Sequence, residues 1–244
     1  MGRLILIGSV TMLAYGNTTA SVEQPQVVIN TSVGTMIATL DRERAPHTVA
    51  NFLELVDAGF YDGLIFHRVI AGFVIQTGGY DVQMQRREGP REIPNESFNG
   101  LRNQKGTLSM ARLEEPDSAS SQFFINLSAN THLDALPGKP GYTVFGHLVA
   151  GTDVAEIIEF AETGILHEMA GVPLEPIVIL SARRRAELPR PGTAASRRLS
   201  DDLWAPCSSH GLLKFPSAAA FDYSNFLKDP PPLGYDRLFY GSVS

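Results

Sequence analysis

Residues 66–79 read Phe-His-Arg-Val-Ile-Ala-Gly-Phe-Val-Ile-Gln-Thr-Gly-Gly. The stretch contains the end of one β-rich run, 64–70, and the whole of a second run, 73–77. Short runs of apolar and β-branched residues are typical of strands buried in a sheet. We therefore expect two short strands here, close together along the chain.

The residues before this stretch predict a hairpin followed by a helix. The runs Val27–Thr31 and Gly34–Leu40 flank a short turn that ends in glycine, which is a hairpin signal. Pro46 suits the first turn of a helix, and Gly59 suits its C-terminal stop. Between them, the apolar residues that recur at helical spacing are Val49, Phe52, Leu53 and Val56.

The residues after the stretch add further strands and a second helix. The β-rich runs are 107–112, 122–127, 143–149 and 175–182. Residues 152–160 are expected to form a helix capped by Thr152 or Asp153. Many short strands with two helices predict a mainly β fold in which an antiparallel sheet closes, or nearly closes, on itself.

The composition excludes several classes of function. The net charge is −6, whereas binding to nucleic acid phosphates needs clustered Lys and Arg, so we do not expect nucleic acid to be the main partner. The chain has one cysteine, Cys207, which can form no internal disulfide. No histidine pairs with a neighbouring Cys, Asp or Glu at a familiar ligand spacing, so we expect no metal.

The two ends of the chain differ from its middle. Arg3 precedes a short apolar run that is followed by small residues, the order found in secretory signals, although a buried first strand is the alternative. Residues 186–244 are rich in Pro, Ser, Ala and Arg and show no sustained hydrophobic period. We therefore predict a signal peptide at 1–20, a folded domain at 21–185 and a disordered tail at 186–244.

Three blocks of sequence resemble the signature of the cyclophilin family. The first is Phe66–Gly79, quoted above. The second is Gly-Thr-Leu-Ser-Met-Ala-Arg at 106–112 with Ser-Ser-Gln-Phe-Phe-Ile at 120–125. The third is Leu133-Asp134 with Tyr-Thr-Val-Phe-Gly at 142–146. Their order and spacing fit the family across residues 26–184, and Ala111, Arg112 and Tyr142 look like its bacterial branch, which includes periplasmic members.

The resemblance implies a fold and an activity. The fold is an eight-stranded antiparallel β-barrel capped by a helix at each end, with a proline-binding groove on its outer face. The activity is peptidyl-prolyl cis-trans isomerisation (EC 5.2.1.8) of Pro-containing polypeptides, which assists protein folding. Rotation about an X-Pro bond breaks no bond and needs no cofactor, nucleophile or metal, but its uncatalysed exchange takes tens of seconds or more.

The resemblance also implies a role for nine residues of this chain. Arg68 would donate a hydrogen bond to the prolyl nitrogen in the twisted state, and Gln76 would hold both the arginine and the substrate backbone. The walls of the proline pocket would be Phe73, Val74, Phe124 and Leu133. Ala111 and Arg112 would contact the substrate backbone, and the Tyr142 hydroxyl would close one side. Because the reaction transfers no proton, we expect His67 to be structural.

Several positions depart from the familiar eukaryotic pattern. Arg112, His132 and Tyr142 replace Asn, Trp and His, and the tryptophan contributes to tight cyclosporin binding, so we expect weak cyclosporin inhibition. Val74 replaces a longer Met, and residues 135–141 lengthen a loop near the groove. We expect a monomeric periplasmic enzyme with no stable membrane association, with a cytoplasmic location as the alternative. A binding module that holds Pro-containing segments without turnover is the competing function.

Overall fold

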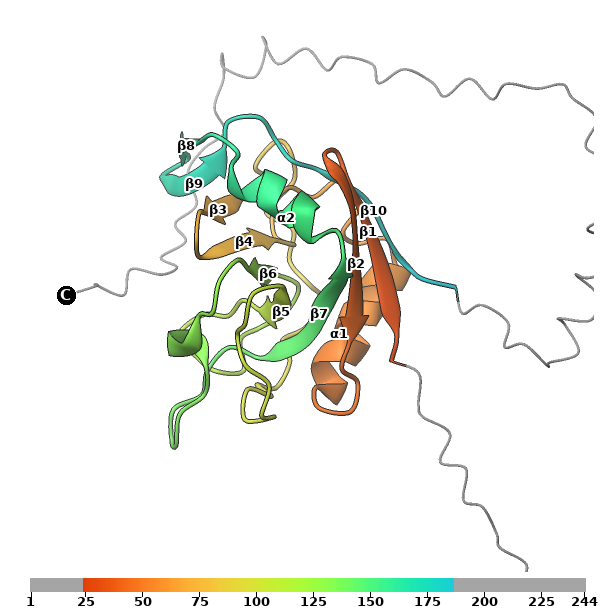
Figure 1. Ribbon diagram of the computed structural model, residues 1–244, viewed down its shortest axis with the longest axis vertical. Coiled ribbons are helices and arrows are strands. Elements are labelled where there is room, and N and C mark those ends of the chain that lie inside the picture. Colours follow the sequence, from red (N-terminus) through yellow and green to blue (C-terminus); the bar gives the residue numbers. More distant parts are fainter. Residues whose placement is uncertain (1–23, 187–244) are drawn as a thin grey trace, which may run out of the picture.

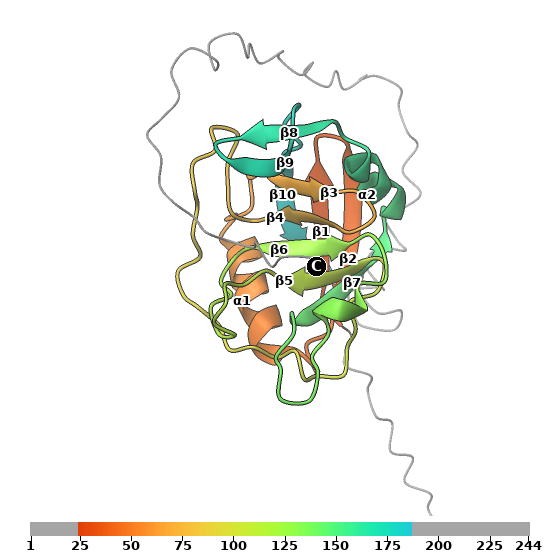
Figure 2. The ribbon, with the colours of Figure 1, turned by 90° about the vertical axis from the view of Figure 1, so that its left-hand side faces the viewer.

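One curled antiparallel sheet dominates the computed structural model, which describes residues 24–186. Its eight strands lie in the order β10-β1-β2-β7-β5-β6-β4-β3. Their bounds are β1 Gln26–Thr31, β2 Gly34–Leu40, β3 Arg68–Ile70, β4 Val74–Thr77, β5 Thr107–Met110, β6 Phe123–Asn126, β7 Val144–Ala150 and β10 Ile179–Arg184. Figures 1 and 2 show the sheet wrapping around a central core. The predicted mainly β fold with eight antiparallel strands is confirmed.

Backbone bonds between irregular segments join the two edges of the sheet. The edge strands β3 and β10 share no ladder. Instead, the residues just before β3 bond to the start of β10 and to the residues that precede it. The Phe66 N–H donates to the Ile177 carbonyl at 2.9 Å, and the Ile179 N–H donates to the Leu64 carbonyl at 2.7 Å. The sheet is thus brought round into a barrel, and only the last part of the predicted strand 64–70 belongs to β3.

Two helices bury their apolar faces in the same core. They are α1, Pro46–Asp57, and α2, Thr152–Glu159, and they lie on opposite sides of the barrel (Figures 1 and 2). Pro46 begins α1 as predicted, and Gly59 follows its end with a φ of 66°. The helical residues in the core include Val49, Phe52, Leu53, Val56, Val154, Ala155 and Ile158. Neither α1 nor α2, the helices of the described residues, could span a membrane.

The predicted cap of α2 is wrong. Thr152 and Asp153 both lie inside the helix, and the capping position belongs to Gly151, which makes no side-chain bond. Gly151 has a φ of 80°, and a Cβ there would lie 2.7 Å from the Cα of Met36. The chain enters α2 so close to β2 that glycine is required, and this contact determines where the helix begins.

The sequence patterns gave no sign of a second, small hairpin. It consists of β8, Thr163–Leu166, and β9, Met169–Pro173. Its two turn residues, His167 and Glu168, have φ values of 47° and 66°. Such turns usually carry Asn-Gly or Asp-Gly, so a His-Glu pair offers no turn signal. The hairpin packs beside β3, where a Cβ at Gly171 would lie 2.8 Å from the Val69 carbonyl oxygen.

Candidate functional site

The register of β3, β4 and β6 aligns three of the predicted site residues. Arg68 lies opposite Gln76, and Gln76 lies opposite Phe124. Side chains alternate between the two faces of a strand, so these three share a face. Their neighbours Val69, Ile75 and Ile125 fill the barrel core instead. The row Arg68-Gln76-Phe124 therefore lies on the outer face of the sheet.

An apolar hollow lies beside this row. Val74, Ala111 and Phe124 form a buried cluster outside the main core. Three half-buried residues, Phe73, Leu133 and Tyr142, pack against it. The hollow has a volume of about 70 Å³ and is lined by Arg68, Phe73, Val74, Gln76, Ala111, Phe124, Leu133 and Tyr142. The structure thus brings together all the predicted site residues except Arg112.

Ring contacts shape the two sides of the hollow. On one side, the rings of Phe124 and Tyr142 meet edge to face, with centroids 5.7 Å apart. On the other, Phe73 stacks on His132 at 5.4 Å with an angle of 22° between the rings. Edge-to-face and offset stacked pairs are the favoured arrangements of aromatic rings. Both walls of the hollow therefore have neighbours that restrict their movement.

Backbone and amide bonds fix the loop residues of the hollow. The Phe73 carbonyl accepts from the Leu127 N–H at 2.9 Å and from the Asn130 side-chain amide at 2.9 Å. Across the hollow, the Tyr142 N–H donates to the Leu133 carbonyl at 2.9 Å. Phe73 lies between β3 and β4, Leu133 ends a 3₁₀ helix at Thr131–Leu133 and Tyr142 precedes β7, and these bonds join the three segments into one wall.

A buried polar network lies beneath that wall, with Asn103 at its centre. The Asn103 Oδ1 accepts from the Ser109 hydroxyl at 2.7 Å and from the Asn126 amide at 3.2 Å. The Asn103 N–H and side-chain amide both donate to Asp134 Oδ1, at 2.8 and 2.9 Å. Asp134 follows Leu133, so the network ties β5 and β6 to the loop that carries one side of the hollow. Satisfied buried networks of this kind are rigid.

Arg68 is the cation at the edge of the hollow. It is half-buried, and within residues 24–186 its guanidinium has no hydrogen-bond acceptor and no ion-pair partner. Burial lowers the pKa of Arg68 from its ordinary value, while Tyr142 acts in the opposite direction. An arginine still remains charged at pH 7. The hollow is therefore edged by a positive group whose N–H donors are available.

Tyr142 is perturbed by the same surroundings. Burial raises the pKa of its hydroxyl, and the nearby Arg112 and Arg68 oppose that rise. The Tyr142 side chain is therefore neutral at pH 7 and can donate a hydrogen bond.

Arg112 lies outside the hollow and holds loops in place. Its Nε and Nη2 donate to the carbonyls of Gly141 and Pro140 at 3.2 and 3.1 Å. Its Nη1 donates to the carbonyls of Leu113 and Glu114 at 2.8 and 3.0 Å. These bonds occupy four of the five N–H groups of a guanidinium. Their acceptors include the end of the loop 135–141, so Arg112 ties that loop to the segment after β5.

The guanidinium of Arg112 also supports the wall of the hollow directly. It lies over the Tyr142 ring, 4.9 Å from its centroid, which is a cation–π contact. Arg112 thus holds both the loop before Tyr142 and the ring of Tyr142 itself.

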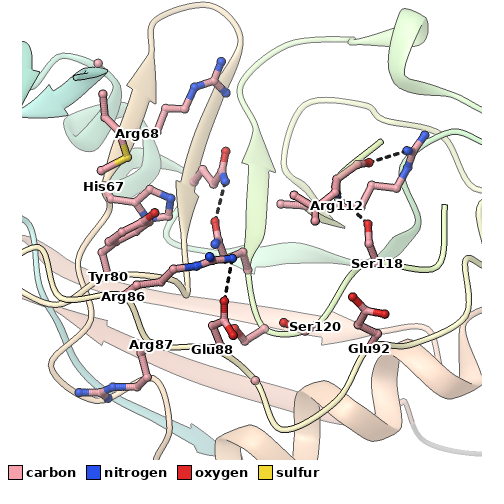
Figure 3. A pocket seen from close by; sticks show the side chains of 18 of the residues that line it. His67, Arg68, Tyr80, Arg86, Arg87, Glu88, Glu92, Arg112, Ser118 and Ser120 are labelled. Carbon is pink, nitrogen blue, oxygen red and sulfur yellow. Dashed lines mark hydrogen bonds and ion pairs between the residues drawn. The ribbon is translucent and has the colours of Figure 1, made fainter. Parts of the chain in front are cut away.

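A larger cavity of about 620 Å³ adjoins the hollow and shares Arg68, Gln76 and Ala111 with it. Figure 3 looks into this cavity, with Arg68 and Arg112 on opposite sides. Arg86 forms an ion pair with Glu88 at 2.9 Å on its floor. The two spaces together form a groove that is apolar at one end and charged at the other.

Gln122 is one of the groove residues that the sequence patterns missed. The Gln76 Nε2 donates to the Gln122 Oε1 at 3.0 Å, and Gln76 is otherwise only 9% exposed. By contrast, the expected hydrogen bond between Gln76 and Arg68 is absent among the described residues. Gln122 lies two residues before Phe124, so strand alternation was the signal that could have placed it on the same face.

His67 lines the larger cavity of the groove but is almost fully buried. It is 3% exposed, and its ring is 4.8 Å from that of Tyr80. Burial lowers the pKa of His67 to about 4 despite a hydrogen-bonding interaction with Gln122 that raises it. Its Nδ1 atom is buried without a hydrogen-bond partner in the described part of the chain. The ring is therefore neutral at pH 7.

Comparisons with known proteins agree with this geometry. The sequence pattern described as "Cyclophilin type peptidyl-prolyl cis-trans isomerase/CLD" matches residues 26–184. The chain is 44% identical over 186 residues to peptidyl-prolyl cis-trans isomerase A of Dickeya dadantii, covering 75% of this chain and 98% of that protein. It is 42% identical over 159 residues to peptidyl-prolyl cis-trans isomerase B of Escherichia coli, covering 64% and 96% of the two chains.

A solved structure shares the fold. A cyclophilin-type peptidyl-prolyl cis-trans isomerase of Cryptosporidium parvum superposes with a TM-score of 0.57 at 27% identity. The match covers 68% of this chain and 99% of that one.

Proposed function

This chain belongs to the cyclophilin-type peptidyl-prolyl cis-trans isomerase family and has that activity, and from this premise we propose that the hollow beside Arg68 is its active site. Its substrates are Pro-containing peptides. One observation carries the proposal: a half-buried guanidinium without a partner among the described residues borders an apolar hollow on the outer face of the sheet.

The chemistry of the imide bond explains why this pairing suits catalysis. The barrier to rotation is about 18–20 kcal/mol because resonance gives the C–N bond partial double-bond character. In the twisted state that resonance is lost, and the prolyl nitrogen gains a lone pair that can accept a hydrogen bond. The Arg68 guanidinium can donate to this nitrogen only in the twisted state. Such a bond stabilises the transition state more than the ground state and so accelerates rotation.

The apolar walls bind the proline ring and remove water from the imide. Phe73, Val74, Phe124 and Leu133 surround the ring, which offers no hydrogen-bond donor. The planar imide is more charge-separated than the twisted one, so an apolar environment favours twisting. Ala111 borders the substrate backbone, and the Tyr142 hydroxyl donates to it at one side.

Gln76 binds the substrate backbone, and Arg112 mainly supports the groove. Gln76 lies opposite Arg68 in the register of β3 and β4, where its carbonyl oxygen can accept from a substrate N–H. Arg112 uses four N–H groups on backbone carbonyls, which leaves one for a substrate carbonyl. Its larger contribution is to hold the loop beside Tyr142.

The test is isomerisation of an Ala-Pro peptide by the wild type, Arg68→Ala and Arg44→Ala. Arg44 is a surface arginine that pairs with Asp41, and it serves as the control. We expect Arg68→Ala to lower kcat/KM by about 100- to 1000-fold, as for loss of one transition-state donor. Arg44→Ala should match the wild type. Equal rates for Arg68→Ala and the wild type would remove Arg68 from the mechanism and favour a groove that binds proline without using this cation.

We also propose that the protein assists folding of exported proteins and resides in the periplasm. The support is the order of charge, apolar run and small residues at the N-terminus, although residues 1–20 lie outside the described residues. The test is N-terminal sequencing of the protein isolated from the periplasmic fraction. A chain that begins at Ser21 would support export, and an intact Met1 in the cytoplasmic fraction would contradict it.

Weak cyclosporin binding and a monomeric state complete the proposal. His132 lies against Phe73 where the resemblance has a tryptophan, so the groove lacks the indole ring and its N–H donor. His132→Trp should therefore strengthen inhibition by cyclosporin without changing kcat/KM.

The proposed monomeric state has its own test. Sedimentation of the full chain at micromolar concentration should give the mass of one chain.

A further inference from the structure

The side chain of Gln122 lies directly behind Gln76. Its Oε1 accepts the hydrogen bond that Gln76 Nε2 donates at 3.0 Å. We propose that Gln122 is a positioning residue, which holds the Gln76 amide so that the Gln76 carbonyl oxygen faces the substrate. This inference rests on the role proposed above for Gln76, and it concerns how that role is maintained.

The backbone of Gln122 is anchored from several directions. Its carbonyl accepts from the N–H of Ala111, a wall of the hollow, at 3.0 Å. The preceding Ser121 carbonyl accepts from the buried Tyr61 hydroxyl at 3.0 Å, and the Ser121 hydroxyl donates to the Gly78 carbonyl at 2.9 Å. The base of the Gln122 side chain is therefore fixed relative to both β4 and the hollow.

A glycine leaves room for the Gln122 amide. A Cβ at Gly79 would lie 2.6 Å from Gln122 Nε2 and 2.8 Å from its Cγ. Real Cβ atoms do not approach other atoms this closely, so any larger residue at 79 would displace the amide. The Gln122 side chain lies against the Gly79 backbone, and this contact limits the positions that the amide can adopt.

The orientation of the Gln122 amide follows from the hydrogen bond that it accepts. Its Oε1 faces Gln76 Nε2 at 3.0 Å, and its own Nε2 lies against Gly79, where a Cβ would approach it to 2.6 Å. The buried ring of His67 is a further neighbour. Burial lowers the pKa of His67 to about 4, and the Gln122 side chain acts in the opposite direction.

The hydrogen bond to Gln122 then fixes the orientation of the Gln76 amide. Gln122 presents an oxygen, so only the NH₂ end of Gln76 can face it. The Gln76 carbonyl oxygen is left as an acceptor toward the groove, where a substrate N–H or the Arg68 guanidinium can donate to it. Without Gln122, the Gln76 amide could turn over and present a donor instead, which would repel both groups.

A double-mutant cycle tests this dependence in the full-length protein. We expect Gln122→Met to lower kcat/KM for an Ala-Pro peptide by about 10- to 100-fold, mainly through kcat. A small misplacement of a group at the reacting bond causes a loss of this size. In a Gln76→Met background the same change should have an effect of less than about twofold, because Gln122 acts through Gln76. Equal losses in both backgrounds, or no loss in either, would overturn the proposal.

Two further variants separate positioning from stability. Gly79→Ala should displace only the flexible end of Gln122, so it should lower kcat like Gln122→Met with little change in Tm. Adding Gly79→Ala to Gln122→Ala should then lower activity no further. Gln122→Glu keeps an acceptor for Gln76 and should restore most of kcat. If Gly79→Ala is fully active, or if Gln122→Glu is as inactive as Gln122→Met, the proposal is wrong.

The outcome also distinguishes this inference from the proposed function. If Gln76→Met alone leaves kcat/KM unchanged while Arg68→Ala abolishes it, Gln122 has no residue to act through and the positioning role fails. The active site at Arg68 would then remain intact. If Arg68→Ala is fully active, the proposed site itself fails, whatever the cycle shows.

Discussion

Two guanidinium groups on the same side of the barrel have opposite environments. Arg68 has no acceptor within residues 24–186, whereas Arg112 donates to four backbone carbonyls. A cation that must bind a transient lone pair has to keep its donors available. A cation that holds a loop has to use them. In the proposed mechanism Arg68 would therefore act in catalysis, whereas Arg112 supports the groove.

A change at Arg112 should weaken the groove without removing its chemistry. Arg112→Lys keeps the charge but cannot donate to four carbonyls in a plane. We expect KM to rise several-fold, kcat to change by less than about threefold, and proteolysis within the loop 135–141 to become faster. Steady-state kinetics and limited proteolysis measure these effects, with Arg44→Lys as the control. A kcat loss as large as that of Arg68→Ala would instead place Arg112 at the reacting bond.

His67 should make the stability of the protein depend on pH. Its pKa is about 4 in the folded chain and about 6.5 when unfolded. Above pH 6.5 neither state binds the proton, so stability is complete. As the pH falls from 6.5 to 4, only the unfolded chain is protonated, and the free energy of unfolding should fall by about 3 kcal/mol.

Urea unfolding at a series of pH values measures this dependence. His67→Gln should flatten the curve between pH 6.5 and 4, because it removes the group that titrates there. His147 is exposed on β7, so His147→Gln is the matched control and should keep the slope of the wild type. An unchanged slope in His67→Gln would show that the ring is not buried in its neutral form.

At the scale of elements, the walls of the hollow depend on a network that contributes no wall itself. Asn103 is 1% exposed and lies between β5, β6 and the loop that carries Leu133. Asn103→Ala would remove the acceptor of the Ser109 hydroxyl and the side-chain donor to Asp134 Oδ1. Asn126 would keep its bond to Thr107, and Asp134 would keep the backbone N–H of residue 103. Buried groups left unsatisfied cost about 1–3 kcal/mol each.

We therefore expect Asn103→Ala to lower the free energy of unfolding by about 1–3 kcal/mol. The exposed Gln83→Ala should change it by less than about 0.5 kcal/mol. Denaturant unfolding measures both values. A loss below 1 kcal/mol for Asn103→Ala would mean that water replaces the missing amide and that the network is not dry.

The strands and helices that were predicted from the sequence pattern are those in which the spacing of apolar residues agrees with the buried faces of the element. β1, β2 and α1 follow the expected ranges closely because their buried apolar residues face one core, and β4 does so because its apolar residues are buried on both faces of the sheet. The small hairpin β8–β9 was missed because its turn adopts positive φ at His167 and Glu168, which carry no turn signal. The start of α2 was misplaced because it depends on contact with β2, which no local pattern records.

At the scale of the whole molecule, family motifs predicted the lining of the hollow better than pattern could. Eight of the nine expected residues line one hollow, although they come from β3, β4, β6, the short 3₁₀ helix Thr131–Leu133 and the loops that carry Phe73, Ala111 and Tyr142. Periodicity shows only that Phe124 and Val74 are apolar, and it cannot separate an outer cluster from the core. The contacts of Gln122 and Arg112 were not predicted, because they depend on segments that meet only in the folded chain.

The described residues should suffice for activity. The sheet, both helices and the whole groove lie within 24–186. A chain limited to residues 24–186 should therefore fold and isomerise an Ala-Pro peptide with a kcat/KM within about twofold of the full chain. Circular dichroism and the isomerisation assay measure this. A folded but inactive truncation would assign residues outside that range a part in catalysis.

The backbone bonds that close the barrel also determine when a newly made chain can finish folding. Phe66 must meet Ile177, and β1 must meet β10, so closure waits until the last strand has left the ribosome. Contacts between such distant residues slow folding. Until then the growing chain has its catalytic strands but an open edge on β1, which can pair with other chains. An enzyme that isomerises X-Pro bonds in other chains is therefore expected to have a slow, late step in its own folding.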